Sequence, residues 1–183
     1  MPLPGGEAAI KSPWRIGLSY LHHVFGNNLP KIPAFKDREI QPILKMLEAN
    51  INSPLTSSCG RLFDAVAALS GGRQEIRYEA QAAIEFMQAA RNELGTDSSL
   101  FESSNINGTN IITMNSIIEN LVSRIRDGKD QVKLSQWFHS SLVNTFSHMT
   151  DILREESGID RVVLSGGVFQ NRLLFESLLE KLE

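Results

Sequence analysis

The sequence contains very little cysteine, since Cys59 is the only one among 183 residues. A single thiol cannot form a disulfide within the chain, and it excludes zinc and iron–sulfur sites built from several cysteines of one chain. No apolar run approaches the roughly 20 residues that a membrane-spanning helix needs. The segment 1–7 has neither the basic nor the apolar region of a secretory signal. We therefore expect a cytoplasmic protein with no membrane partner.

The sequence also lacks a strong excess of charge. It has 18 Lys and Arg against 21 Asp and Glu, a formal net charge of -3. Such a chain has no general electrostatic attraction to nucleic acid, so we expect no nucleic-acid partner. With 42% hydrophobic and 21% charged residues, the composition is typical of a soluble globular domain, and the length suffices for one domain or two small subdomains.

Apolar residues at helical spacing predict a series of helices along the whole chain. Ser12 before Pro13 is typical of a helix start, and Ser116 with Glu119 resembles a capping box. Residues 96–110 are polar and predict an exposed loop, whereas 111–114 is a candidate short strand. Predicted helices lie at residues 13–25, which Gly26 ends, and at 37–51, 78–94, 116–127 and 170–183. One more buried helix follows Ser58 and ends at Gly71, and another carries the apolar stripe from Phe138 to Leu153, which Gly158 ends.

Residues 161–164 (RVVL) are the one clear strand pattern. A short continuous apolar run is typical of a parallel-sheet strand that is covered on both faces. Such a strand needs neighbours, and this chain supplies few. The sequence therefore predicts a helix-rich α/β fold whose sheet is only partly present in the chain.

Two segments are candidates for ligand binding. In Ser165–Asn171 (SGGVFQN), two glycines after the strand allow close backbone approach to a ligand at the start of a helix. In Ser57–Asp64 (SSCGRLFD), small residues precede an apolar helix and leave backbone amides accessible. Each segment also has a simpler structural interpretation, as a sharp turn and as an ordinary capped core helix.

The nucleophilic and metal-ligating side chains form no recognisable catalytic pattern. Cys59 lies near a helix start, where a thiolate is stabilised, but no histidine is paired with it by a motif, so packing is the simpler role. A small hydrolase that uses Cys59 is a further alternative. The four histidines, His22, His23, His139 and His148, have no metal-ligand spacing and are predicted to be surface or packing residues.

Four ordered segments together resemble the hydrogenase maturation carbamoyltransferase family HypF. Residues 2–15 are similar to the family's Pro-Leu-Pro-Gly-Gly-(Asp/Glu)-Ala-Ala-Ile…Pro-Trp-Arg stretch, and 56–69 to its Ser-Ser-x-Gly-Arg-Leu-Phe-Asp-Ala motif. Residues 78–83 match Tyr-Glu-Gly-Gln-Ala-Ala, with Ala80 in place of the glycine, and 164–174 match the C-terminal Ser-Gly-Gly motif. They span nearly the whole chain.

The resemblance implies a partial actin-like ATPase (ribonuclease H-like) domain, related to the threonylcarbamoyl transferase family TsaD, over residues 1–183. In HypF a carbamoyl adenylate made from ATP is bound with a divalent metal, and the carbamoyl group passes to the C-terminal cysteine of the partner HypE. By the same resemblance, the residues expected on the ribose side of the nucleotide are Ser58, Gly60, Arg61 and Asp64, and those expected to close over the adenosine are Gly166, Gly167 and Asn171.

The resemblance also implies segments that this chain does not contain. The family has an adenylate-forming domain and a first lobe before the segment that matches residues 2–15, and an Asn-Asp-Gly-Gly segment with a metal-ligand aspartate after the Ser-Gly-Gly motif. The chain then corresponds to a second lobe without metal ligands, and we expect no transfer by the isolated chain. The alternative is a non-catalytic nucleotide-binding or interaction module, which completes its sheet with a separate first lobe or by self-association.

Overall fold

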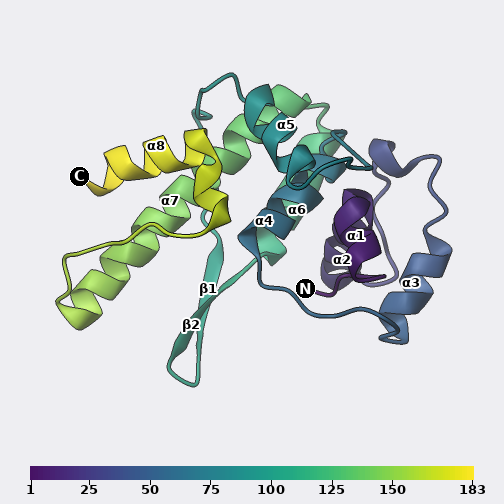
Figure 1. Cartoon of the computed structure of the whole chain (residues 1–183), viewed down its shortest axis with the longest axis horizontal. Helices are drawn as coiled ribbons and strands as arrows, with labels where there is room; N and C mark the ends of the chain where they lie inside the picture. Colours follow the sequence, from purple (N-terminus) through teal and green to yellow (C-terminus); the bar gives the residue numbers. More distant parts are fainter.

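The computed structural model describes residues 1–183 and is built mainly of helices (Figure 1). In chain order, its elements are α1 (Glu7–Lys11), α2 (Pro13–Phe25), the 3₁₀ helix η1 (Pro33–Phe35), α3 (Gln41–Glu48), α4 (Cys59–Leu69), α5 (Gln81–Ala89), β1 (Glu102–Ile106), β2 (Thr109–Thr113), α6 (Asn115–Arg126), α7 (Gln131–Ser157), the 3₁₀ helix η2 (Gly167–Gln170) and α8 (Arg172–Leu182). No helix combines the length and apolar character needed to cross a bilayer.

Helix α4 lies at the centre of the core, and small residues let α2 pack closely against it. Ala65, Ala67 and Ala68 are fully buried. On α2, a Cβ at Gly17 would lie 3.2 Å from the Leu69 side chain and 3.4 Å from the Ala65 carbonyl oxygen. The two backbones can therefore approach only because these side chains are small or absent.

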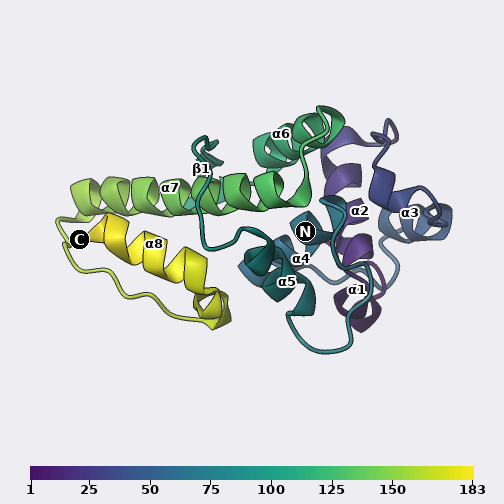
Figure 2. The same cartoon turned by 90° about the horizontal axis from the view of Figure 1, so that it is seen from above.

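Helix α7 is the longest element, and α8 packs beside its C-terminal half (Figure 2). The side chain of Asp130 accepts a hydrogen bond from the Lys133 N–H at its start, and Gly158 ends it in the left-handed conformation at φ 70°, as residues of these types commonly do. The predicted stop at Gly158 is confirmed. The N-terminal half of α7 is buried against α4, α5 and α6, whereas its last turns are largely exposed.

The prediction of a loop over residues 96–110 is wrong for its second half. Strands β1 and β2 form an antiparallel hairpin in which Ile106 pairs with Thr109, so Asn107 and Gly108 alone make the turn. Both have positive φ, 54° and 81°, and the Asn-Gly pair is the preferred sequence for such a two-residue turn. The hairpin is mostly exposed and projects from the helices (Figure 1).

The strand predicted at residues 161–164 does not form in this chain. Residues 159–165 make no backbone–backbone hydrogen bond, and Val162 and Val163 are 47% and 82% exposed. The physical reason is that a strand needs a neighbour to pair its amide and carbonyl groups. The chain offers none here, and β1 and β2 pair only with each other.

Two predicted helices are shorter in the structure, and two predicted caps do not form. Helix α3 ends at Glu48 rather than at residue 51, and α5 lies between left-handed residues at Ala80 and Arg91, which interrupt helical geometry. Neither Ser12 nor Ser116 caps its helix. The Ser12 hydroxyl instead donates to Glu75 Oε2 at 2.5 Å.

Candidate functional site

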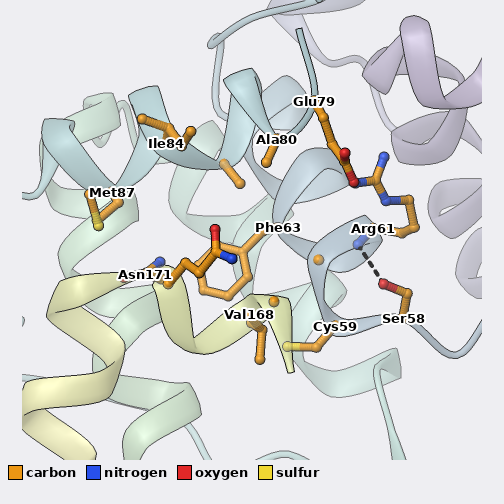
Figure 3. A pocket seen from close by; sticks show the side chains of 14 residues that line it. Ser58, Cys59, Arg61, Phe63, Glu79, Ala80, Ile84, Met87, Val168 and Asn171 are labelled. Carbon is orange, nitrogen blue, oxygen red and sulfur yellow. Dashed lines mark hydrogen bonds between the residues drawn. The ribbon is translucent and has the colours of Figure 1, made fainter. Parts of the chain in front are cut away.

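Three segments that are far apart in sequence meet around a cavity of about 590 Å³ (Figure 3). They are the first turns of α4, the start of α5 and the η2 turn that leads into α8. The volume lies within the range of small-molecule sites, roughly 300–1,000 Å³. The lining residues are Ser58, Cys59, Gly60, Arg61, Phe63, Glu79, Ala80, Ala83, Ile84, Met87, Gly167, Val168, Gln170 and Asn171.

The first wall is the N-terminus of α4. The Ser58 hydroxyl accepts a hydrogen bond from the Arg61 N–H at 3.4 Å, as Figure 3 shows, and so caps the helix. The first turn of a helix presents backbone N–H groups without intrahelical acceptors. Gly60 adds no side chain over them, and a Cβ there would have only Ser58 Oγ, at 3.5 Å, within 4 Å. This end of the cavity can therefore donate hydrogen bonds from the backbone to a ligand.

Arg61 and Asp64 form a buried ion pair behind this wall. Arg61 Nη1 lies 2.8 Å from Asp64 Oδ2, and the Asp64 side chain has no solvent exposure. Burial raises the pKa of the Asp64 carboxyl to about 6, although the positive charge of Arg61 opposes this rise. Asp64 thus holds the Arg61 side chain at the cavity and does not itself line it.

The second wall is the η2 turn. Gly166 adopts a φ of 101°, which side chains strongly disfavour, and it reverses the chain before Gly167 and Val168 reach the cavity. A Cβ at Gly167 would meet no atom within 4 Å. The glycine backbone is therefore directly accessible from the cavity.

Asn171 connects this turn to α8 and lies near the middle of the cavity (Figure 3). Its side-chain oxygen accepts a hydrogen bond from the Leu174 N–H at 3.0 Å, which caps α8. Its side-chain nitrogen lies 2.9 Å from Nε2 of His139 on α7. The amide is therefore held at both ends.

The third wall, from α5, separates a polar end of the cavity from an apolar one. In Figure 3, Glu79 lies on the same side as Arg61, whereas Ile84 and Met87 lie on the opposite side. Phe63 closes the floor and is only 1% exposed. A ligand with one flat apolar part and one polar part matches this arrangement.

The structure brings together five of the seven residues that the resemblance assigned to the nucleotide. Gly166 supports the η2 turn from just outside the wall, and Asp64 lies beneath the surface behind Arg61. The five that line the cavity are Ser58, Gly60, Arg61, Gly167 and Asn171. Sequence reasoning missed the α5 wall, and it assigned His139 no role at the site.

Cys59 also lines the cavity, but its thiol is not activated. Burial raises the pKa of Cys59 to about 12, so the thiol stays protonated at neutral pH. Although the residue stands at a helix N-terminus, desolvation outweighs the stabilisation that this position offers a thiolate. The geometry therefore does not support a hydrolase that uses Cys59 as nucleophile.

The whole chain matches one family model, described as the second subdomain of the Kae1-like domain of carbamoyltransferases, over residues 1–183. The chain belongs to this family. It is 28% identical to carbamoyltransferase HypF2 of Cupriavidus necator, over 100% of this chain and 25% of that protein. It is 30% identical to carbamoyltransferase HypF of Rhizobium leguminosarum bv. viciae, over 97% of this chain and 22% of that protein.

Solved structures of HypF share the fold. A full-length HypF, crystallised in a phosphate- and nucleotide-bound form, superposes with a TM-score of 0.81 and 36% identity over 99% of this chain and 28% of that chain. HypF of T. kodakarensis gives a TM-score of 0.78 and 26% identity over 98% of this chain and 24% of that one. The predicted resemblance to the C-terminal part of HypF is confirmed, and so is the partial α/β fold class, although residues 161–164 are unpaired here. The chain spans about a quarter of the length of these relatives.

The residues of this chain do not fit the divalent metal that the resemblance implies for the family. No three His, Cys, Asp or Glu side chains gather anywhere in residues 1–183 in a way that could hold an ion. His139, the most buried histidine, has both ring nitrogens engaged by protein groups. The chain by itself supplies no complete ligand set for a metal.

Proposed function

We propose that this HypF-family chain supplies the wall that binds the nucleoside part of a carbamoyl adenylate during ATP-dependent carbamoyl transfer in hydrogenase maturation. In that reaction the carbamoyl group passes to the C-terminal cysteine thiolate of a HypE-like partner. The observation that carries the proposal is the convergence of the α4 N-terminus, the η2 glycine turn and α5 on one cavity of about 590 Å³. The similar full-length HypF, which was crystallised in a phosphate- and nucleotide-bound form, supports it.

The charges around the cavity favour the nucleoside over the phosphates. Arg61 is the only cation and Glu79 the only anion among the lining residues, and Asp64 already pairs with Arg61. A triphosphate therefore meets no excess of positive charge here, unlike in a site built for phosphates. The apolar side chains Ile84 and Met87 offer a surface for a flat purine base.

Each polar wall residue has a role that follows from its position. The capped N-terminus of α4 presents backbone N–H groups for ribose or carbamoyl oxygens. Gly167 lets the backbone of the η2 turn approach the ligand, and Asn171 donates a side-chain N–H. None of these groups has to transfer a proton, so the chain binds and orients the adenylate, and the transfer step requires the rest of the protein.

Calorimetric titration of the chain with adenosine, AMP and ATP tests this proposal. We expect the three dissociation constants to agree within about threefold, because the phosphates add little attraction here. Asn171→Ser should weaken binding roughly tenfold, since it removes one hydrogen-bond donor. Serine also caps helices well, so the melting temperature should change little.

Asn144→Ser is the matched control, because Asn144 lies on α7 and binds Ser98 and Lys181 away from the cavity. It should leave the nucleotide affinity unchanged. Absence of adenosine binding by the unmodified chain would contradict the proposal. Equal binding by Asn171→Ser and the unmodified chain would contradict the assigned cavity.

A second candidate function is an interaction module that completes its sheet with a separate first lobe or with a second copy. The observation that favours it is the strand-like segment 159–165, which has no backbone partner and exposes Val162 and Val163. Light scattering over a concentration series, with and without a separately produced first lobe, tests it. A chain that stays monomeric and binds no first lobe would contradict this candidate.

A further inference from the structure

His139 is a completely enclosed titratable residue near the cavity. It lies in the buried half of α7 and has no solvent exposure. Its ring lies 5.2 Å from the Phe63 ring and 6.0 Å from the Phe86 ring, centroid to centroid. Phe63 belongs to the cavity floor, so the imidazole lies directly behind the site and not in it.

The partners of the imidazole determine its tautomer. Nδ1 lies 2.8 Å from the Ser135 carbonyl oxygen. A carbonyl can only accept, so Nδ1 must carry the hydrogen. Burial lowers the pKa of His139 to about 4, so the ring is neutral at pH 7 and Nε2 has a free lone pair. Nε2 is therefore an acceptor.

This acceptor fixes the orientation of the Asn171 amide. The Asn171 Nδ2 lies 2.9 Å from His139 Nε2, and the Asn171 Oδ1 accepts from the Leu174 N–H at 3.0 Å. A flipped amide would place its oxygen against the Nε2 lone pair and its NH₂ group against an N–H donor. Both contacts would be repulsive, so only one orientation satisfies both neighbours.

The orientation leaves one donor for a ligand. Nδ2 carries two hydrogens, and the protein uses one of them, toward His139. Since Asn171 lines the cavity, the second N–H is available to a hydrogen-bond acceptor there. A purine ring nitrogen and a ribose hydroxyl are acceptors of this kind.

We propose that His139 is a positioning residue for the nucleotide site, which orients the Asn171 amide so that its free N–H, and not its oxygen, is offered to the ligand. This inference rests on the proposed nucleotide function. It makes the site select a ligand that presents an acceptor to Asn171. It also couples the long helix α7 to the ligand through two hydrogen bonds.

The first test is the imidazole tautomer, measured by ¹⁵N NMR on the unmodified chain labelled at histidine. We expect His139 to carry its hydrogen on Nδ1, which is the less common tautomer of free histidine, and the Asn171 side-chain amide to show a single set of signals. A hydrogen on Nε2 would overturn the inference. This test requires neither a variant nor a ligand.

The second test is a double-mutant cycle in adenosine binding. His139→Phe retains an aromatic ring among Phe63 and Phe86 but removes the Nε2 acceptor. In the unmodified background it should weaken binding by roughly fivefold to tenfold. In the Asn171→Ser background it should have no further effect, because the group on which it acts is absent. His148→Phe, on the exposed side of α7, is the matched control and should leave binding unchanged.

The outcomes separate the inference from the proposed function. Equal losses in both backgrounds would show a general structural effect of His139 and would overturn the positioning role. If the unmodified chain binds no adenosine, AMP or ATP, the proposed function fails and the nucleotide part of the inference fails with it. If it binds and the cycle is additive, the function stands and only the inference fails. Should His139→Phe not fold, the tautomer measurement still decides the orientation.

Discussion

Ala80 shows at the residue scale how one backbone conformation shapes the site. It has φ 61° and ψ 11°, the left-handed region, directly before α5. An alanine there costs about 1 kcal/mol relative to glycine, and the resembling family motif has glycine at this place. Ala80→Gly should therefore raise the free energy of unfolding by about 1 kcal/mol, measured by urea denaturation.

The matched control for this change is Ala83→Gly on the same helix. Ala83 has ordinary helical geometry within α5, so glycine there should lower the free energy of unfolding by a similar amount, about 1 kcal/mol. The same substitution, alanine to glycine, should thus change the free energy of unfolding in opposite directions at the two positions. Equal destabilisation by both would show that residue 80 is not strained.

Gly167 permits a second prediction at the residue scale. A Cβ at this position meets no atom within 4 Å, and its φ is not left-handed, so Gly167→Ala should fold without loss of stability. Its methyl group would enter the cavity, and adenosine affinity should decrease several-fold. Gly166→Ala, at φ 101°, should instead lower the melting temperature. An unchanged affinity in Gly167→Ala would place the ligand elsewhere.

At the scale of elements, the central helices α4 and α7 each bury a titratable group, with opposite consequences for stability. Burial raises the pKa of Asp64 on α4 to about 6 and lowers that of His139 on α7 to about 4. The contribution of Asp64 to the free energy of unfolding is fully present below pH 3.8, and it is lost as the pH rises through 6 because the buried carboxyl must then ionise. The contribution of His139 to the free energy of unfolding is fully present above pH 6.5, and it is lost as the pH falls toward 4 because the buried imidazole must then take up a proton.

Asp64→Asn separates the two effects. The unfolding free energy of Asp64→Asn minus that of the unmodified chain should increase as the pH rises from about 4 to about 6 and stay constant above, because asparagine buries no charge. The increase should be at most about 3 kcal/mol. Urea denaturation across roughly pH 4–8 measures it. A difference that is independent of pH would show that the native carboxyl has an ordinary pKa.

The hairpin and the helix ends show which elements the sequence alone could indicate. Gly26 and Gly158 end α2 and α7 as predicted, because a glycine after an apolar helical pattern is a local signal. The Asn107-Gly108 turn carries an equally local signal, which would have predicted the hairpin. The late start of α5 was not predictable, since an alanine in the left-handed region is rare.

At the scale of the whole molecule, the apolar segment of residues 161–164 lies largely exposed on the surface of this chain. Val163 is 82% exposed, whereas Val66 is fully buried. Val163→Lys should therefore change the free energy of unfolding by less than about 0.5 kcal/mol. Val66→Lys, with the same chemistry, should prevent stable folding. Thermal unfolding of both variants measures the contrast, and a strongly destabilised Val163→Lys would show that the segment packs against the chain.

The sequence by itself determined the helical framework, the family and the two glycine-bearing segments that line the cavity, because helix periodicity, turn residues and ordered motifs are local properties. The tertiary structure alone decided that Asp64 lies behind Arg61, that α5 closes the cavity and that His139 contacts Asn171, which is 32 residues away in sequence. It also decided that residues 161–164 remain unpaired. These outcomes depend on burial and on hydrogen-bond partners from distant segments. An apolar strand pattern indicates that a segment can pair with a neighbouring strand, but only the tertiary structure shows whether such a neighbour is present.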